Sequence, residues 1–448
     1  MPHAEPESER AVPSPTGARF AVAGWLCGLS GLLYLDRICM GQAVVPIQRE
    51  LGVTNTEMSL VLMSFTLAYG LFAVPAGRLG DTIGPRAVLS SLVLAWSVFT
   101  ALTGAATGLL VLVGVRFLFG AAEAGALPNA TKIVATWFPA AERGRVQGLL
   151  LAFAQLGAVA APAGTAHLIG AAGWRVVFFV YGALGAFWAL GFWVWFRNDP
   201  AQHHGVNPGE LNHIRAGAPE PAQGAAPGPV PWGAVATNRG VLVLSLIMVG
   251  GAFYTYFFYS WFQKYLSAAR GVGNVEAGNL TSLVMAGSAV GMLGGGWLAD
   301  RLSRRADPVR ARRYLGVGCY LVAAGALFLG IRQEDALALA LLWGTSFCAM
   351  HVTLPNWWLC AIPLCGRHTA TLCGLMNGLG VFGAMASQGF VGWFTDWRGE
   401  QGYTGRSAWD PLFDVYVGVL LANAVAWWLY RVVPLPEPPP VPTEGAEP

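Results

Sequence analysis

Four charged side chains interrupt two apolar stretches that are each long enough to cross a bilayer. Arg116 and Glu123 lie in residues 109–130, and Asp36 and Arg37 lie in residues 20–44. A spanning helix needs about 20 apolar residues, and a charge near its centre costs about 2.5–3.5 kcal/mol on the insertion scale. Residues seven positions apart share a helix face, about 10 Å apart along the axis. Charges held at this cost indicate a site for a charged substrate or for protons.

These residue types favour the binding of an organic anion coupled to proton movement. The planar guanidinium of Arg37 or Arg116 can bind a carboxylate through two hydrogen bonds and keeps its charge. Asp36 and Glu123 can carry protons, because burial and neighbouring arginines shift the pKa of a carboxylate in opposite directions. An anion that reaches the arginines would compete with these acids. A structural alternative is that the charges only form ion pairs that lock two helices together, and the two interpretations are compatible.

The composition indicates an integral membrane protein. Of 448 residues, 55% are hydrophobic and 11% are charged, and the mean hydropathy is +0.51. Ordinary soluble domains carry about 25% charged residues. The net charge of +3 comes without a basic block, which argues against nucleic-acid binding. The seven cysteines form no CxxC pair, so we expect neither a metal site nor disulfides, and we expect no cofactor.

The apolar stretches predict an all-α protein with twelve transmembrane helices in two bundles of six. The expected organisation is a disordered tail (1–19), an N-terminal six-helix bundle (20–196), a cytoplasmic linker (197–238), a C-terminal six-helix bundle (239–432) and a second disordered tail (433–448). The expected spans lie near 20–43, 56–76, 87–106, 109–130, 145–169, 175–196, 240–266, 277–299, 313–331, 335–356, 370–393 and 411–431.

The distribution of basic residues predicts that both termini are cytoplasmic. With the N-terminus inside, the cytoplasmic segments hold 18 Lys and Arg and the outer loops hold 7; Arg37 and Arg116 complete the 27. Cytoplasmic loops of membrane proteins carry such an excess. We therefore expect a multi-pass protein of a cell membrane, the bacterial inner membrane in particular.

A repeated loop indicates that the two halves arose by duplication. Residues 77–86 (GRLGDTIGPR) and 296–305 (GWLADRLSRR) place G-x-L-x-D after the second span of each half, 219 residues apart. Glycine permits a tight turn, and aspartate can cap a helix or pair with an arginine. We expect a gating or structural role for five residues of these loops: Gly77, Asp81, Arg86, Asp300 and Arg301.

The loop resembles the signature of the major facilitator superfamily, although Thr82 and Pro85 depart from it. Further segments resemble the anion:cation symporters of that superfamily, which include hexuronate, galactonate and glucarate carriers and the sialin-like and vesicular glutamate carriers. In the last of these segments Gln263 replaces the usual proline. The segments are 34–37 (YLDR), 116–124 (RFLFGAAEA), 137–143 (WFPAAER), 199–210 (DPAQHHGVNPGE) and 261–266 (WFQKYL).

The resemblance implies two bundles that open alternately to each side around a central cavity. It implies symport of a small organic anion, a sugar acid above all, with protons as the coupling ion and sodium left open. Helix rise puts Asp36, Arg37 and Arg116 at one depth and Glu123 deeper. We expect a monomer in the lipid bilayer. The expected substrate-binding residues are Arg37, Arg116, Tyr34, Tyr69, Gln155 and Asn377, and the expected proton carriers are Asp36 and Glu123.

The alternatives to this hypothesis are a drug:proton antiporter, a membrane enzyme and an ion channel. A drug:proton antiporter is the main rival, but paired buried arginines argue against it. A membrane enzyme would need a catalytic cluster and a channel would need a repeated pore loop, and the sequence shows neither. Asn356, Gln388 and His351 are weaker candidates. We expect some rings of the aromatic run 253–261 to line the cavity, although such a run is more typical of packing. Gly287, Gly291 and Gly295 predict a helix-packing face.

Overall fold

The computed structural model describes residues 13–216, 230–304, 307–365 and 368–431, and these residues contain helices and no strand. Eleven of the helical segments in this part of the chain are long and apolar enough to cross a membrane, and α15 adds a further helix of 32 residues. The fold prediction is confirmed. The long helices are α1 (Ala18–Leu51), α2 (Asn55–Ile83), α3 (Pro85–Gly104), α4 (Leu109–Glu123), α5 (Ala126–Trp137), α6 (Ala140–Ala172), α7 (Trp174–Trp195), α10 (Arg239–Ser260), α12 (Asn274–Ser303), α13 (Pro308–Ile331), α14 (Ala336–Cys365), α15 (Thr369–Glu400) and α17 (Leu412–Leu429).

The same pairing of helices recurs in the two halves. In the N-terminal half α1 packs on α6, α2 on α4 and α3 on α7; in the C-terminal half α10 packs on α15, α12 on α14 and α13 on α17. These are equivalent pairs if each half is one six-span unit, which supports the duplication. The halves meet through α2 with α15 and through α6 with α12.

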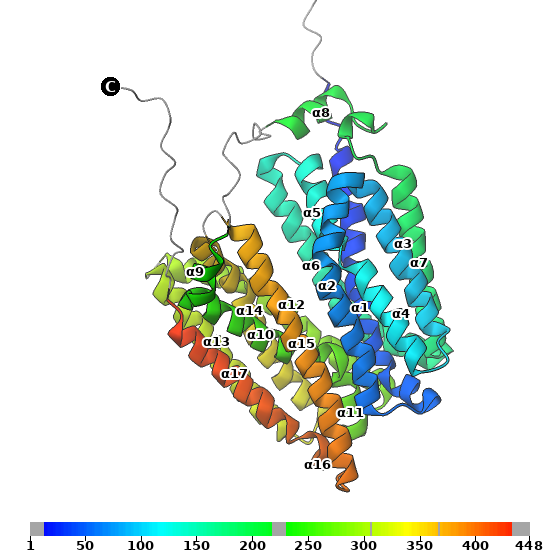
Figure 1. The fold of residues 1–448 in the computed structure, drawn as a ribbon, viewed down its shortest axis with the longest axis vertical. Coiled ribbons are helices and arrows are strands. Elements are labelled where there is room, and N and C mark those ends of the chain that lie inside the picture. The colour runs from blue at the N-terminus through cyan, green and yellow to red at the C-terminus, as the bar shows by residue number, and fades with distance from the viewer. Residues whose placement is uncertain (1–12, 217–229, 305–306, 366–367, 432–448) are drawn as a thin grey trace, which may run out of the picture.

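Figure 1 shows the two halves converging at one end and diverging at the other. We call the divergent end the termini side; it carries residues 13–17 and the short helices α8 (Pro208–Arg215) and α9 (Trp232–Thr237). The other end, the far side, carries the α1–α2 turn and the short helices α11 (Phe262–Arg270) and α16 (Arg406–Trp409).

Two of the expected spans are broken helices, one in each half. The stretch 109–130 folds as α4 and α5, with the break directly after Glu123. Pro128 has no N–H for the carbonyl of Ala124, so a continuous helix would lose a hydrogen bond there. The stretch 240–266 breaks between Ser260 and Trp261, where α10 ends and α11 begins. The first break lies inside the candidate span Leu109–Trp137, whereas the second follows α10, which is long enough to cross a membrane by itself.

The glycine face of α12 packs against α14, as the sequence predicts. A Cβ atom added to Gly287, Gly291 or Gly295 would lie 2.2 to 2.4 Å from a backbone carbonyl oxygen of α14. Contacts this short leave no room for any side chain. The stripe of small residues therefore sets the separation of these two helices.

We expect Gly291→Ala to destabilise the protein and Gly294→Ala to leave it stable. The first substitution places a methyl group 2.2 Å from the carbonyl oxygen of Cys348, whereas nothing lies within 4 Å of the second. Overpacking of this kind costs about 1–3 kcal/mol. Thermal unfolding in detergent measures the difference, and equal unfolding midpoints for the two variants would contradict the close packing of α12 on α14.

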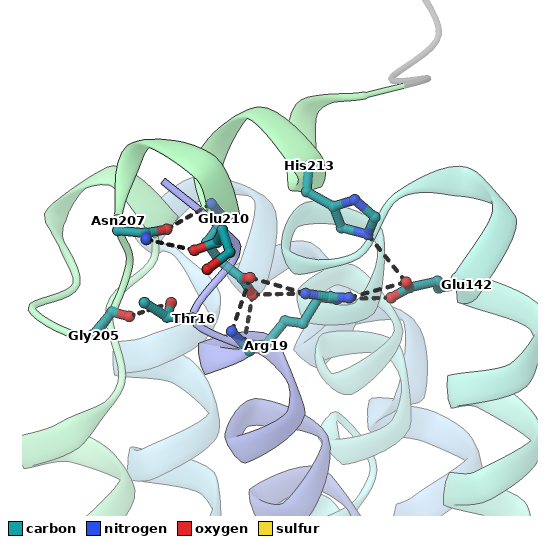
Figure 2. Close-up of polar contacts among 9 residues, drawn as sticks. Thr16, Arg19, Glu142, Gly205, Asn207, Glu210 and His213 are labelled. Carbon is teal, nitrogen blue, oxygen red and sulfur yellow. Dashed lines mark hydrogen bonds and ion pairs between the residues drawn. The ribbon is translucent and has the colours of Figure 1, made fainter. Parts of the chain in front are cut away.

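The ends of the N-terminal half are more ordered than their composition suggests. We expected residues 1–19 to form a disordered tail, but α1 begins at Ala18, and Arg19 is 7% exposed and forms ion pairs with Glu142 and Glu210, each at 2.9 Å. Residues 1–12 and the expected tail 433–448 lie outside the described residues. Figure 2 shows this cluster, in which His213 also contacts Glu142 at 3.2 Å.

The expected linker contains helix α8, which is tied to α1 through Glu210. Asn207 caps α8, and its side chain accepts from the backbone N–H of Glu210. Burial pushes the pKa of Glu210 up, but the backbone N–H groups of Gly17 and Arg19 and the Arg19 guanidinium outweigh burial and leave the pKa lowered. This part of the linker is therefore a docked helix rather than a free tether.

Candidate functional site

Arg37 and Glu123 form a buried ion pair that joins α1 to α4. Arg37 Nε and Nη2 both donate to Glu123 Oε1, at 3.0 and 2.5 Å. Glu123 is 1% exposed, and its second oxygen, Oε2, has no hydrogen-bond partner. The depth estimate from sequence separates Arg37 from Glu123, and this separation is wrong, because their side chains are hydrogen-bonded. One of the two arginines is thus already bound to an acid.

Asp36 and Arg116 are equally buried but do not form a hydrogen-bonded pair. Neither carboxylate oxygen of Asp36 has a hydrogen-bond partner within the described residues, and the same holds for Nε and Nη1 of Arg116. The two side chains are close enough to interact electrostatically, and Trp96 is also near Asp36. Arg116 instead lies over aromatic rings, with its guanidinium carbon 4.3 Å from the centre of Phe119. Arg116 therefore keeps hydrogen-bonding capacity that its neighbours do not use.

A small cavity at the junction of the two halves joins the two arginines to side chains of the C-terminal half. Arg37 and Arg116 line it from the N-terminal half, together with apolar side chains of α1 and α2. The residues that line it from the C-terminal half are Tyr256, Tyr259, Ser260 and Gln388. They lie at the α10–α11 break and on α15. Charge comes from one half of this cavity and neutral polar groups come from the other.

Arg37 and Arg116 line this cavity, but the other four predicted substrate-binding residues do not. Tyr34 and Tyr69 lie beside Arg37, whose guanidinium carbon is 5.5 and 4.7 Å from their ring centres. Gln155 instead donates to Ser288 at 3.2 Å and so joins α6 to α12. Asn377 is an exposed residue of α15 and does not line the cavity.

The weaker candidates in the C-terminal half have other contacts. Asn356 donates to the backbone oxygen of Arg312 at 2.9 Å, and His351 contacts the backbone oxygen of Phe347 at 2.8 Å. Neither lines the cavity. Gln388, a weaker candidate from sequence, does line it. Tyr256 and Tyr259 are rings of the aromatic run from which some members were expected at the cavity, without a choice among them. Ser260, in the same run, was missed.

The repeated loops lie at the termini side. The side chains of Asp81 and Asp300 lie outside the described residues. A Cβ atom on Gly77 would meet Pro128 of α5 at 3.5 Å. Arg86 donates to the backbone oxygen of Trp193 at 2.9 Å and so joins α3 to α7, and Arg301 lies over Trp297. Arg86 therefore holds helices together within one half.

The far side holds a polar contact between the halves, which we call the far-side contact. The carboxylate of Asp396, on α15, accepts from the backbone N–H groups of Asn55 and Thr56 at 3.2 and 2.6 Å. Asn55 also donates to Thr395 at 3.0 Å. Lys264 of α11 contacts Gln48 and Asn55. A carboxylate at a helix N-terminus is stabilised by the free N–H groups and the helix dipole.

The two charged side chains of this contact, Lys264 and Asp396, differ in their surroundings. Burial lowers the pKa of Lys264 to about 8, against the opposing charge of Asp396. The lysine therefore loses its charge more readily than an exposed one. The Asp396 carboxylate binds backbone groups of α2, whose donors do not titrate.

We expect Asp396→Asn to weaken closure of the far side. Asparagine keeps one acceptor oxygen but loses the second acceptor and the negative charge. This loss costs about 1 kcal/mol, which is roughly a fivefold change in a two-state equilibrium. In this variant the distribution of distances between spin labels at Arg49 and Glu400, measured by pulsed electron paramagnetic resonance, should gain a component at longer distance. Asp414→Asn is the matched control, since this exposed carboxylate lies in the first turn of α17 on the same side. Identical distance distributions in the two variants would contradict a closing role for Asp396.

Comparison with known proteins places this geometry among transporters. The sequence model of the Major Facilitator Superfamily matches residues 26–387. A probable sulfoacetate transporter of Cupriavidus necator is 32% identical over 82% of this chain and 85% of its own, and a D-galactonate transporter of Escherichia coli is 28% identical over 89% and 92%. A solved bacterial homologue of the human lysosomal transporter Spinster superposes with a TM-score of 0.75 at 19% identity, over 92% of this chain and 96% of its own.

Proposed function

Because this chain belongs to the Major Facilitator Superfamily of multi-pass membrane transporters, we propose that it imports a small organic anion together with protons. A sugar acid is the substrate class that we favour. The observation that carries the proposal is a cavity between the halves that is lined by two arginines. Arg116 is buried, and Arg37, whose side chain is 11% exposed, is already bound to the buried acid Glu123. The chain acts as a monomer, since one chain contributes both halves of the cavity, and it needs no cofactor.

The ion pair supplies the coupling. An incoming carboxylate binds Arg116 and competes with Glu123 for Arg37. Protonation of Glu123 removes its charge, so Arg37 becomes free for the anion without leaving an unpaired carboxylate buried. Release of the anion on the other side returns Arg37 to Glu123 and expels the proton. Asp36, beside Arg116, is the second group that can hold a proton.

Movement of the halves gives access from alternate sides. The hydrogen bonds located between the halves, within the described residues, run from mid-span to the far side, and they include those of Asp396, Gln388 and Gln155. We propose that the far side faces the cell exterior, because Lys and Arg are concentrated in loops of the opposite side. Import then requires that the far-side contact open to admit the anion and close behind it.

The names of the relatives define the substrates to be tested. One is named for sulfoacetate, another for D-galactonate and a third, from Escherichia coli, for galactarate and D-glucarate. A carboxylate with further polar groups is common to these compounds. The two buried arginines fit such an anion better than the lipophilic cations expected of a drug:proton antiporter.

We expect Arg116→Ala to abolish anion binding while the protein stays folded. Removal of a buried, hydrogen-bonding charge from an anion site costs about 2–5 kcal/mol of binding free energy. A thermal-shift panel of uronates, aldonates, aldarates, short dicarboxylates and sulfoacetate on purified protein measures binding. Arg145→Ala, a change at an exposed arginine of α6, is the control. Unchanged affinity in Arg116→Ala would remove this arginine from the site, and stabilisation by lipophilic cations alone would favour the antiporter.

We expect Glu123→Gln to lose proton-driven accumulation but to retain exchange of substrate. Glutamine keeps the shape of the side chain but cannot carry a proton, so the transport cycle lacks its coupling step. Proteoliposomes with an imposed pH gradient measure accumulation, and counterflow without a gradient measures exchange. Glu276→Gln, at an exposed position of α12, is the matched control.

A sodium gradient forms a separate arm of the same experiment. Full proton-driven accumulation in Glu123→Gln would exclude Glu123 as the carrier. If the wild-type protein accumulates substrate with a sodium gradient but not with a proton gradient, then sodium and not the proton is the coupling ion.

A further inference from the structure

The C-terminal half contributes neutral polar groups to the small cavity that Arg37 and Arg116 line. Among these groups, Gln388 is held by hydrogen bonds of both its backbone and its side chain. It is 2% exposed. Its backbone oxygen accepts from the indole N–H of Trp261 at 3.2 Å, which holds α15 against the α10–α11 break. The amide therefore reaches the cavity from a fixed backbone position. A side chain whose backbone is held in this way is suited to binding one particular group of a substrate.

The side-chain amide of Gln388 uses only half of its hydrogen-bonding capacity. Its Oε1 accepts from Thr66 of the N-terminal half at 2.9 Å, and its Nε2 donates to Ser260 at 3.0 Å. An amide has two N–H donors and two acceptor positions. One donor and one acceptor position therefore remain, on a side chain that lines the cavity.

The close approach of the two halves places this amide opposite the arginines. Gly41 of α1 packs on the last turn of α10, where an added Cβ would lie 2.3 Å from the backbone oxygen of Tyr259. No bulkier residue would allow this approach. An anion held by Arg37 and Arg116 must then turn its remaining polar groups toward the C-terminal wall, where Gln388 and Ser260 lie.

We propose that Gln388, positioned by Ser260, determines specificity by binding a hydroxyl group of the anion. A hydroxyl both donates and accepts, which matches the free donor and acceptor of the amide. A carboxylate or sulfonate only accepts and would use the donor alone. The site thus prefers hydroxylated carboxylates to anions of similar size without hydroxyls. This inference rests on the proposed function, since the arginines must hold the anion first.

The bond from Thr66 links this recognition to the movement of the halves. Thr66 lies on α2 and Gln388 on α15, the two helices through which the halves meet on this side. When the far side opens, Thr66 moves away and Gln388 loses one partner. A substrate hydroxyl can take that place, so the anion is held while the halves separate.

The test compares acids that differ in one hydroxyl. Binding is measured by thermal shift and counterflow for malate and succinate, and for the tightest-binding sugar acid with its deoxy analogue. In Gln388→Leu the affinity for the hydroxylated member should fall roughly tenfold, since one hydrogen bond is lost and its partner is left unpaired. The affinity for the other member should stay within about twofold, which also shows that the variant is folded. Gln388→Asn, which keeps the amide on a shorter side chain, should be intermediate.

The outcomes separate the two proposals. If the wild type binds anions but Gln388→Leu affects both members of a pair equally, Gln388 is only structural and the inference is wrong. A wild type that binds succinate as tightly as malate, and deoxy acids as tightly as sugar acids, also overturns it. If the wild type binds no anion at all, the proposed function itself fails.

Discussion

The ion pair between Arg37 and Glu123 is the interaction on which the rest of the structure depends. Both groups are removed from water, so separating them leaves two uncompensated charges in a medium of low dielectric constant. Breaking a buried pair by removing one partner costs about 3–5 kcal/mol. Arg37 can therefore change partner only if a proton neutralises Glu123 or another anion arrives. In the function proposed above, the same desolvation lets the pair couple proton and anion movement, and Arg116, on its aromatic rings, is the group available to the anion.

The broken helices give this pair its surroundings. Helix α4 ends at Glu123 and α5 begins at Ala126, while α10 ends at Ser260 and α11 begins at Phe262. Each break therefore brings the negative end of one helix next to the positive end of another, and the two partial charges oppose each other. The charge of Glu123 is balanced by the arginines rather than by a helix end.

The sequence was sufficient for the fold and for the charged side of the site, and insufficient for the neutral side. Apolar length, the repeated loop and the glycine stripe of α12 are local patterns with direct physical consequences, and they predicted the helices and their packing. The depth estimate treated Asp36 and Arg37 as one level, but adjacent residues lie about 100° apart on a helix. Arg37 therefore meets Glu123 while Asp36 lies near Arg116 and Trp96.

Gln388, Ser260 and Asp396 could not be predicted in the same way, because each takes its role from contact with a distant helix. A single glutamine in a span has no periodic pattern around it, and Asp396 looks like a surface charge at the end of an apolar stretch. Composition was also misleading for residues 13–19, because it takes no account of the ion pairs of Arg19. Contacts between residues 123 to 341 positions apart are set by packing that no local window contains.

The unequal division of charge between the halves follows from the requirement that they separate. An ion pair within one bundle moves as a unit, so its desolvation cost does not change as the bundles rock. An ion pair across the cavity would have to break in each cycle, leaving both charges unpaired at every opening. Neutral groups such as Gln388 and Ser260 can lose partners from the other half at about 1 kcal/mol per hydrogen bond. Within the described residues, the contacts that Asp396 and Lys264 make with the N-terminal half lie at the end of the spans, where water can replace them when the far side opens.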